Sequence, residues 1–224
     1  MKIDACQFDT IARTVFAPVY PVIADQIIDH TGITSGTCLD VGCGPGHLGA
    51  TLACKTELYL LFFDQSREML ELCERTIDEK GLRGRAGLLP GDIGSIALPD
   101  GSVDLIISRG SIFFWDDLPQ AFREIHRVLT PGGKTFIGGG FGSVALKQSI
   151  RNQMAARNQG KDQFGQKMRT NLGPEMRRRF EECLQAAEIN NFTILQDEEI
   201  GLWIMMHKPV DNNHSSQSTK RKET

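Results

Sequence analysis

The apolar residues of this chain follow two alternating patterns. A run such as LYLLFF at 58–63 has no polar position, which is typical of a strand buried on both faces. Other segments place apolar residues three or four positions apart, which indicates amphipathic helices. Because the two kinds of segment alternate, we expect an α/β fold. Its sheet is predicted to be doubly wound, Rossmann-like and mostly parallel, with helices on both faces.

Seven segments have the composition of strands, and they lie at residues 37–41, 58–63, 88–89, 103–108, 134–138, 192–195 and 202–206. The last two have little sequence between them, so we expect them to pair as an antiparallel hairpin. Helices are predicted between the other strands, at residues 48–54, 67–80, 118–129 and from 174 onward. The N-cap residues Ser66 and Asp117 begin two of these helices, and Gly81 and the turn TPGGK at 130–134 end them.

A helical lead-in over residues 1–36 is predicted to precede the sheet. Apolar residues recur every four positions from Ile11 to Ile27, which indicates one or two amphipathic helices. Pro18 and Pro21 are the points at which this segment should break or bend.

The length of 224 residues suits one α/β domain with a full core. We assign residues 1–207 to that domain. Residues 142–172 are polar and weakly periodic, and we interpret them as a lid over the substrate. Residues 208–224 lack apolar periodicity, which predicts a disordered tail.

Charge and cysteine content narrow the function classes. The net charge is −3, and the predicted tail holds four basic and two acidic residues. The body is therefore more acidic than the whole chain, and a nucleic-acid partner is not expected.

The six cysteines include no C-x-x-C pair, so no metal site is predicted. No apolar run is long enough to span a membrane, and the start MKIDACQFDT does not resemble a signal peptide. We therefore expect a cytoplasmic protein with reduced thiols; the sequence carries no signal of oligomeric state.

The stretch CLDVGCGPGHLG at 38–49 places four glycines directly after the first predicted strand. Such a turn lets a ligand approach the backbone at the start of a helix. Read from Gly44 it matches G-x-G-x-x-G, the dinucleotide fingerprint. In that register the first glycine of the motif should make the tight turn directly after the strand, but Gly42 already occupies that place. Pro45 also lacks the backbone N–H that would donate to a pyrophosphate. Read from Gly42 the loop follows Asp40, whose carboxylate suits a cationic ligand better than a diphosphate.

Two further acidic residues follow the next strands. Asp64 ends the second strand, 18 residues after Gly46, near the spacing at which a carboxylate accepts both ribose hydroxyls. Asp92, in PGDIG, follows the third strand and is placed to accept from an adenine amino group. Each acid alone is equally well explained as a loop cap or a solvated turn residue. Three at successive strand ends indicate one ligand with an ammonium group, a ribose and an adenine, which is S-adenosylmethionine.

On these residues the chain resembles the class I S-adenosylmethionine-dependent methyltransferases, of the kind typified by the ubiquinone/menaquinone-biosynthesis enzymes. The resemblance runs through LDVGCGPG, FDQSREML, GDIGSIALPDGSVDLIISRGSIFFWDD and AFREIHRVLTPGGKTFIG, and covers residues 8–140. It implies S-adenosylmethionine as cofactor, a seven-stranded sheet with the last strand antiparallel, and a small-molecule substrate.

The resemblance also implies a set of cofactor contacts. Expected at the methionine and ribose end are Asp40, Gly42, Cys43, Gly44 and Gly46; at the ribose, Asp64 and Gln65; at the adenine, Met69, Asp92 and Ile93; and towards the methionine moiety and substrate entry, Ser108, Arg109 and Gly110. No catalytic residue is assigned. The sulfonium already activates the methyl group, so alignment of the reactants can supply about 7–11 kcal/mol and a base is needed only for a protonated acceptor of high pKa.

Several other residues carry two interpretations each. His47 opens the first helix and is either near the ligand or, the better expectation, a solvated first-turn residue. Phe16 and Tyr20 of the lead-in either cover the cofactor or pack in the core. The three aromatic residues after the fourth strand either contact substrate or pack on the next helix: Phe113, Phe114 and Trp115.

Two more groups are open to a second interpretation. Cys38 and Cys43 could form a thiol relay, although a cysteine between these glycines is commonplace in the wider family. The basic residues 177–179, with Lys167 and Arg169, either hold an anionic substrate or, by default, form a solvated helix face.

Three hypotheses for function follow: a small-molecule methyltransferase, a protein that binds S-adenosylmethionine without transferring methyl, and a nicotinamide oxidoreductase. The first fits the sequence best. Methyl transfer separates it from the second, and titration with NADH and S-adenosylhomocysteine separates it from the third.

Overall fold

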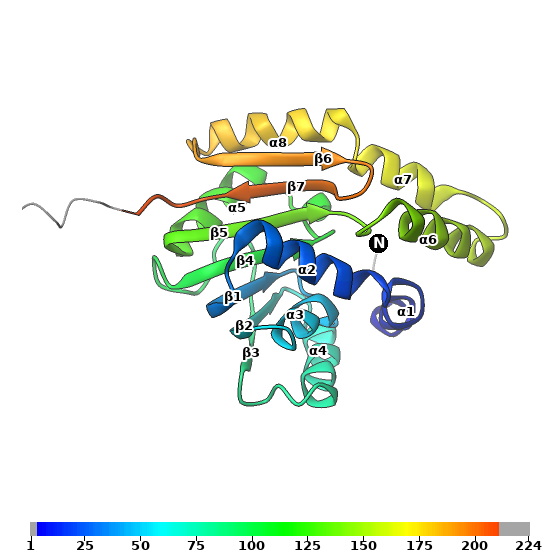
Figure 1. Ribbon diagram of the computed structural model, residues 1–224, viewed down its shortest axis with the longest axis horizontal. Helices are drawn as coiled ribbons and strands as arrows, with labels where there is room; N and C mark the ends of the chain where they lie inside the picture. Colours follow the sequence, from blue (N-terminus) through cyan, green and yellow to red (C-terminus); the bar gives the residue numbers. More distant parts are fainter. Residues whose placement is uncertain (1–3, 211–224) are drawn as a thin grey trace, which may run out of the picture.

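One seven-stranded sheet forms the centre of the computed structural model, which describes residues 4–210 of the chain (Figure 1). The strands are β1 Ser35–Val41, β2 Glu57–Asp64, β3 Ala86–Pro90, β4 Val103–Arg109, β5 Leu129–Gly139, β6 Phe192–Asp197 and β7 Gly201–Met206. Their order is β3-β2-β1-β4-β5-β7-β6, and β7 runs antiparallel to both β5 and β6. The predicted hairpin and antiparallel last strand are confirmed. The order reverses between β1 and β4, and ligands of such sheets bind beyond the carboxyl ends of the strands at this point.

Helices cover both faces of the sheet. They are α1 Ala5–Ile11, α2 Val19–Thr31, α3 His47–Ala53, α4 Arg67–Glu79, α5 Leu118–Val128, α6 Val144–Arg157, α7 Gln163–Asn171 and α8 Pro174–Ala186, with short segments η1 Ala12–Phe16 and η2 Ile112–Phe114. One hydrophobic core joins α2, α3 and α4 to the sheet, and a second joins α5 and α8 to the opposite face. The doubly wound arrangement predicted from the alternation of segments is therefore confirmed.

The lead-in consists of two helices joined at a sharp bend. Pro18 is the N-cap of α2, and the axes on either side of it differ by 76°. Pro21 lies in the first turn of α2, where a missing N–H costs nothing, and the helix continues through it. Within residues 4–210, no single helix is long and apolar enough to cross a membrane. The bent pair Ala5–Phe16 and Val19–Thr31 has that length and composition only when its two helices are taken together.

Strand β5 begins earlier than predicted. The turn expected at residues 130–134 is part of the strand, because its backbone has partners on both sides. Leu129 pairs with Val103 of β4, and the N–H of Gly132 donates to the carbonyl of Lys208 at 2.7 Å. The N–H of Lys208 donates in turn to Gly133 at 3.0 Å, so ordered structure continues past residue 207. The rest of the predicted tail, residues 211–224, lies outside the described residues.

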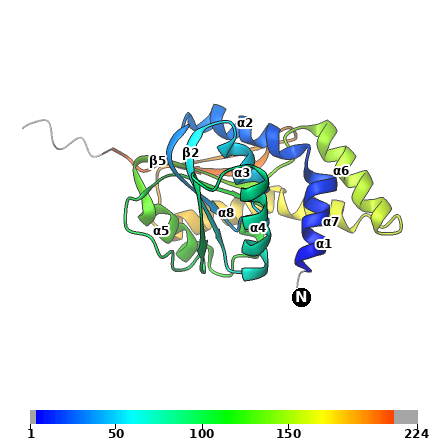
Figure 2. The ribbon, with the colours of Figure 1, turned by 90° about the horizontal axis from the view of Figure 1, so that it is seen from below.

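The polar segment 142–172 forms two helices, α6 and α7, capped by the side chains of Ser143 and Asp162. Its weak periodicity has a physical cause, because few of its side chains reach the core: Ile150 is the one buried residue of α6. Figures 1 and 2 show α6 and α7 beside α1, at one end of the molecule beyond the strand tips.

Candidate functional site

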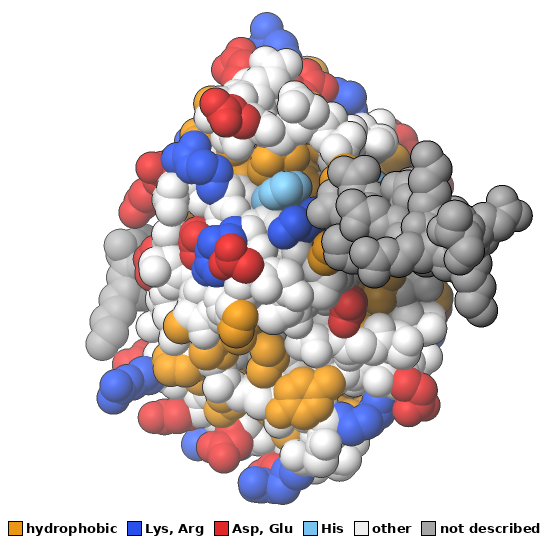
Figure 3. Space-filling view, turned by 90° about the vertical axis from the view of Figure 1, so that its left-hand side faces the viewer, with side chains coloured by type: hydrophobic (Ala, Val, Ile, Leu, Met, Phe, Trp, Pro, Cys, Tyr) orange, Lys and Arg blue, Asp and Glu red, His pale blue; other side chains and the backbone are white. Residues whose placement is uncertain are grey.

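A cavity of about 930 Å³ lies at the carboxyl ends of the strands. Its floor comes from residues at or just after the ends of β1, β2, β4 and β5, and its walls include side chains of α1, η1, α2 and α7. The volume is near the top of the range of about 300–1,000 Å³ found for small-molecule sites. The opposite end of the molecule, shown in Figure 3, carries acidic and basic side chains interspersed with small apolar patches.

The structure brings most of the predicted cofactor contacts to this cavity. Those that line it are Gly42, Gly44, Asp64, Gln65, Met69, Asp92, Ile93, Arg109 and Gly110. Four do not reach its wall: Asp40, Cys43, Gly46 and Ser108. The donors and acceptors present suit a nucleoside, because carboxylates stand beside an apolar thioether and backbone amides, but the role of each residue stays a prediction.

The glycine loop passes very close to its neighbours. Gly42 has φ +63°, and a Cβ there would lie 2.3 Å from the Cβ of Ser111. Gly46 has φ +78°, and its Cβ would lie 2.4 Å from the Sγ of Cys73. Only glycine combines this left-handed backbone with such close approach, which explains the spacing of the loop in physical terms.

Asp64 fixes the shape of this loop. One carboxylate oxygen accepts from the N–H of Gly44 at 2.9 Å, and the other accepts from the N–H of Ser66 at 2.9 Å. A carboxylate has about four acceptor sites, so two remain for a ligand. Asp64 thus joins the glycine loop to the start of α4 and still faces the cavity.

Asp40 differs from the expectation. Its side chain is buried, it does not line the cavity, and it accepts from the N–H of Gly49 in α3 at 3.1 Å. Burial raises the pKa of this carboxyl to about 7. The direct contact with an ammonium group that we inferred from its place in the sequence is therefore not supported by the geometry. Because Asp40 lies beneath the glycine loop, we expect it to influence the ligand through that loop and not by direct contact.

Asp92 lies at the rim of the cavity. It is exposed, and its carboxylate accepts from the N–H of Gly94 at 2.8 Å, which is the turn-capping role that we weighed as the alternative. Because Asp92 and Ile93 both line the cavity, this cap leaves room for the predicted adenine contact.

Ser111 lines the cavity and was missed by sequence reasoning. Its hydroxyl donates to the carbonyl of Val41 at 3.0 Å and lies 2.6 Å from the hydroxyl of the buried Ser108. Ser108 therefore lies behind Ser111 and does not line the cavity itself. A serine two residues after a strand has no distinctive pattern, so the sequence held no signal for it.

Arg109 is surrounded by aromatic rings. Its Cζ lies 5.1 Å from the ring centre of Phe16, 5.9 Å from that of Tyr20 and 5.6 Å from that of Phe141. Its Nε donates to the carbonyl of Gly140 at 3.1 Å. Burial raises the pKa of Tyr20 to about 12, so the phenol is protonated at neutral pH. Burial lowers the pKa of Arg109, but a guanidinium still stays charged at neutral pH.

The remaining aromatic candidates also line the cavity. Phe16 and Tyr20 line the cavity and also pack against the core, so both of the roles that we considered for them agree with the structure. Phe113 stacks on Phe180 of α8 at 6.2 Å, whereas Phe114 is exposed.

His47 is not solvated, contrary to our expectation. Its Nε2 lies 2.8 Å from the carboxylate of Asp9 in α1, and its side chain is 11% exposed. Burial lowers the pKa of His47. The lead-in helix thus covers the start of α3, and His47 joins the two elements without lining the cavity.

A thiol relay is not supported. Cys38 is fully buried in β1, and neither Cys38 nor Cys43 lines the cavity. Burial raises the pKa of both thiols, so both stay protonated. The six cysteines are all free, and among the described residues no cluster of His, Cys, Asp and Glu could hold a metal ion.

The basic residues divide between two places. Lys167 of α7 lines the cavity, with its Nζ 4.7 Å from the ring centre of Phe114. Arg178 and Arg179 are exposed on α8, away from the cavity, in agreement with a solvated helix face. Arg177 differs, because it is half-buried and donates to the carbonyl of Ile194 at 2.8 Å.

Comparisons with known proteins agree with this geometry. Residues 39–137 match the family described as "Methyltransferase domain". The Bacillus subtilis methyltransferase YdaC, itself uncharacterized, is 33% identical over 57% of this chain and 69% of its own length. The match to methyltransferase GfsG of Streptomyces halstedii is also 33% identical, but spans 51% of this chain and only 42% of GfsG.

A solved structure extends the similarity to the whole fold. A Methanococcus maripaludis protein, assigned as an S-adenosyl-L-methionine-dependent methyltransferase, is 41% identical, with 92% of each chain covered and a TM-score of 0.87. This chain belongs to the S-adenosyl-L-methionine-dependent methyltransferases, and S-adenosyl-L-methionine is its cofactor.

Proposed function

We propose that this protein transfers a methyl group from S-adenosyl-L-methionine to a small-molecule acceptor bound in the same cavity. The observation that carries the proposal is the cavity of about 930 Å³, lined by Asp64 and Asp92 on one side and by aromatic side chains on the other. Such a volume accommodates a nucleoside and a second small ligand.

Two relatives support a small acceptor by their names. A malonyl-[acyl-carrier protein] O-methyltransferase of a Methylovorus species is 33% identical over 47% of this chain, and a sterol 24-C-methyltransferase of Pneumocystis carinii is 30% identical over 46%. The chain spans 37% and 28% of these two proteins, so their acceptors are not transferred to it.

The cofactor supplies a methyl group that its sulfonium already activates, and the protein aligns the acceptor and excludes water. We assign the nucleoside to the Asp64 side, with Asp64 and Gln65 at the ribose and Met69, Asp92 and Ile93 at the adenine. Helix α7 lines the cavity through Phe164, Lys167, Met168 and Asn171, which supports residues 142–172 as its lid.

Three titratable side chains that could be considered as a general base do not suit that role. Tyr20 is protonated at neutral pH, His47 is bound to Asp9, and Asp40 lies beneath the loop. We infer that catalysis depends on alignment, which can supply about 7–11 kcal/mol, and that the acceptor is deprotonated in solution or has a low pKa.

Asp64→Ala is the first test. We expect wild-type protein to bind S-adenosylhomocysteine with micromolar affinity in calorimetric titration, and the variant to bind at least about tenfold more weakly, because it loses both the ligand contact and the bonds that shape the glycine loop. Asp78→Ala, on the exposed end of α4, is the control and should bind as wild type. Equal affinity in the Asp64 variant contradicts the assignment, and tight NADH binding favours an oxidoreductase.

A second function keeps the same cofactor without methyl transfer. The arginine-hydroxylase NDUFAF5 of Danio rerio is 30% identical over 64% of this chain and 41% of its own length, so relatives with other names exist. Single-turnover assays with methyl-tritiated S-adenosylmethionine and a panel of acceptors separate the two. Label in an acceptor supports transfer, whereas binding without label in any acceptor favours the second function.

A further inference from the structure

Among residues 4–210, Arg109 is a cation at the wall of the cavity without a carboxylate partner. No ion pair of Arg109 is present within residues 4–210, and its one described hydrogen bond leaves from Nε to Gly140. Among the described residues, Oε1 of Gln26 is the one buried side-chain nitrogen or oxygen that lacks a hydrogen-bond partner. The terminal nitrogens of Arg109 also lack a described partner, so they are not fully buried. A guanidinium stays charged, and a desolvated charge is costly unless it is paired.

Its surroundings select the kind of partner that fits. Phe16, Tyr20 and Phe141 lie within 6 Å of Cζ, and we call these residues and Arg109 the arginine cage. Rings around a guanidinium help to hold it in place. Because the described hydrogen bond of Arg109 uses Nε, the Nη1–Nη2 end is left as its free donor edge. That edge matches the two oxygens of a carboxylate.

The arginine cage lies apart from the predicted nucleoside contacts. Those contacts follow β2 and β3, whereas the cage is built from the end of β4, the residues after β5, and the lead-in helix. In the sheet order these ends lie on opposite sides of β1. Lys167, over Phe114, adds a second cation to the cavity wall.

We infer that the arginine cage binds an anionic group, a carboxylate or its equivalent, on an acceptor whose apolar body packs against the aromatic wall. This rests on the proposed function and narrows it. A cationic acceptor is disfavoured, because its charge would lie beside that of Arg109.

The test uses matched probes on protein saturated with S-adenosylhomocysteine. We expect 3-phenylpropionate to bind at least about tenfold more tightly than its neutral isostere 3-phenylpropanamide in calorimetric titration, because a charge-assisted pair replaces a neutral one. Arg109→Gln should abolish the preference and Arg109→Lys should reduce it, since lysine lacks the planar fork. Arg178→Gln, exposed on α8, should keep the wild-type preference.

Other outcomes overturn the inference. Equal affinity for the two probes in wild type, or no binding of the carboxylate, contradicts it without any variant. Weaker S-adenosylhomocysteine binding in Arg109→Gln, with unchanged binding of 5′-methylthioadenosine, assigns Arg109 to the carboxylate of the cofactor. Binding of 5′-methylthioadenosine also shows that the variant is folded. If wild type binds neither nucleoside, the proposed function itself fails, and that result is distinct from loss of the probe preference.

Discussion

Asp40 shows how a residue can be in the predicted place and have a different role. The sequence puts an acid at the end of β1, and the structure has one there, but the pleat of the strand turns its side chain towards α3. The carboxylate holds the N–H of Gly49 and supports the glycine loop from below. Sequence spacing identified the strand end correctly, whereas the direction of one side chain depends on packing that no spacing encodes.

Asp40→Asn tests this role through the pH dependence of stability. The pKa of Asp40 is about 7 in the folded protein and 3.8 in an unperturbed carboxyl, so the folded state binds this proton more tightly. The contribution of Asp40 to stability is therefore most favourable below pH 3.8 and is lost as the pH rises through 7. Asparagine can still accept from Gly49 and carries no charge.

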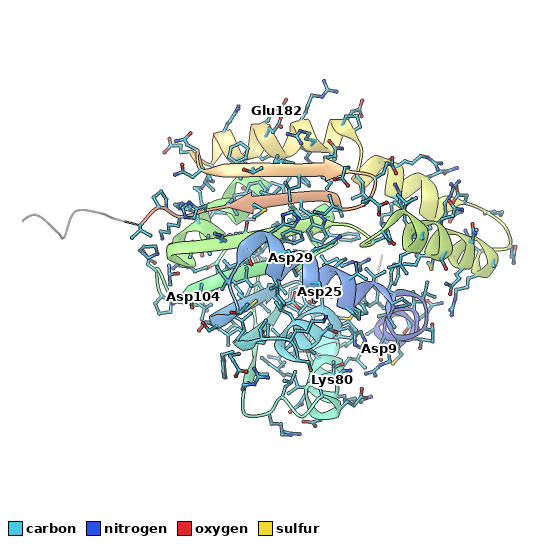
Figure 4. All side chains as sticks on the ribbon, in the orientation of Figure 1. Asp9, Asp25, Asp29, Lys80, Asp104 and Glu182 are labelled. Carbon is cyan, nitrogen blue, oxygen red and sulfur yellow. The ribbon has the colours of Figure 1, made fainter. Side chains whose placement is uncertain are left out.

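We expect the advantage of Asp40→Asn over wild type to grow from about zero near pH 4 to on the order of 2–4 kcal/mol at pH 8, measured by urea unfolding without cofactor. Asp29→Asn is the matched control, since Asp29 is exposed on α2 (Figure 4) and its substitution should leave the curve unchanged. A constant difference between wild type and Asp40→Asn at all pH values contradicts the account.

At the scale of elements, the lead-in is fastened to the domain by a small polar network. Asp9 of α1, labelled in Figure 4, accepts from Arg13 Nε at 2.8 Å and lies 2.8 Å from His47 Nε2. Arg13 also donates to Glu79 at the end of α4, at 2.6 Å. The network joins α1 and η1 to α3 and α4, and so holds one wall of the cavity in place.

Removing Arg13 should loosen that wall locally. In Arg13→Ala we expect faster amide hydrogen exchange over residues 5–16 and little change in global stability, because part-exposed ion pairs contribute only about 0–1 kcal/mol. Arg123→Ala, on the exposed face of α5, should exchange as wild type. Unchanged exchange over residues 5–16 in the Arg13 variant contradicts the role of the network.

The sequence predicted elements best where burial dominates. Strands β2 and β4 lie within one residue of their predicted ends because a continuous apolar run is stable only when it is buried in the sheet. Ser66 and Asp117 cap their helices as expected. The start of β5 was missed because its partners are Val103 and Lys208, which are far apart in sequence. Helices α6 and α7 escaped the pattern because few of their side chains are buried: Ile150 in α6, and Gly165 and Met168 in α7.

Site residues divide in the same way. Gly42, Asp64 and Asp92 could be placed at the cavity because strand ends and turns fix the backbone there. The contact between His47 and Asp9 and the rings around Arg109 could not, since they join the lead-in helices to distant strand ends through side chains alone.

At the scale of the whole molecule, the sheet order explains how one cavity can hold both the cofactor and the proposed acceptor. The reversal between β1 and β4 opens a crevice at the strand ends, and the lead-in with α7 encloses it. Asp64 and Asp92 lie towards β2 and β3, and the arginine cage lies towards β4 and β5. A cationic cofactor and an anionic acceptor can therefore meet with their reacting ends over β1.

A crystal structure with S-adenosylhomocysteine tests this account most directly. We predict the nucleoside in the cavity of about 930 Å³, with the ribose hydroxyls on Asp64 and the adenine beside Asp92 and Ile93. We expected Arg109 to face both the methionine moiety and the substrate entry; we now predict that its Nη edge contacts the acceptor and remains free of the cofactor. Density for the nucleoside outside this cavity, or an orientation that places the adenine against the arginine cage, would contradict it.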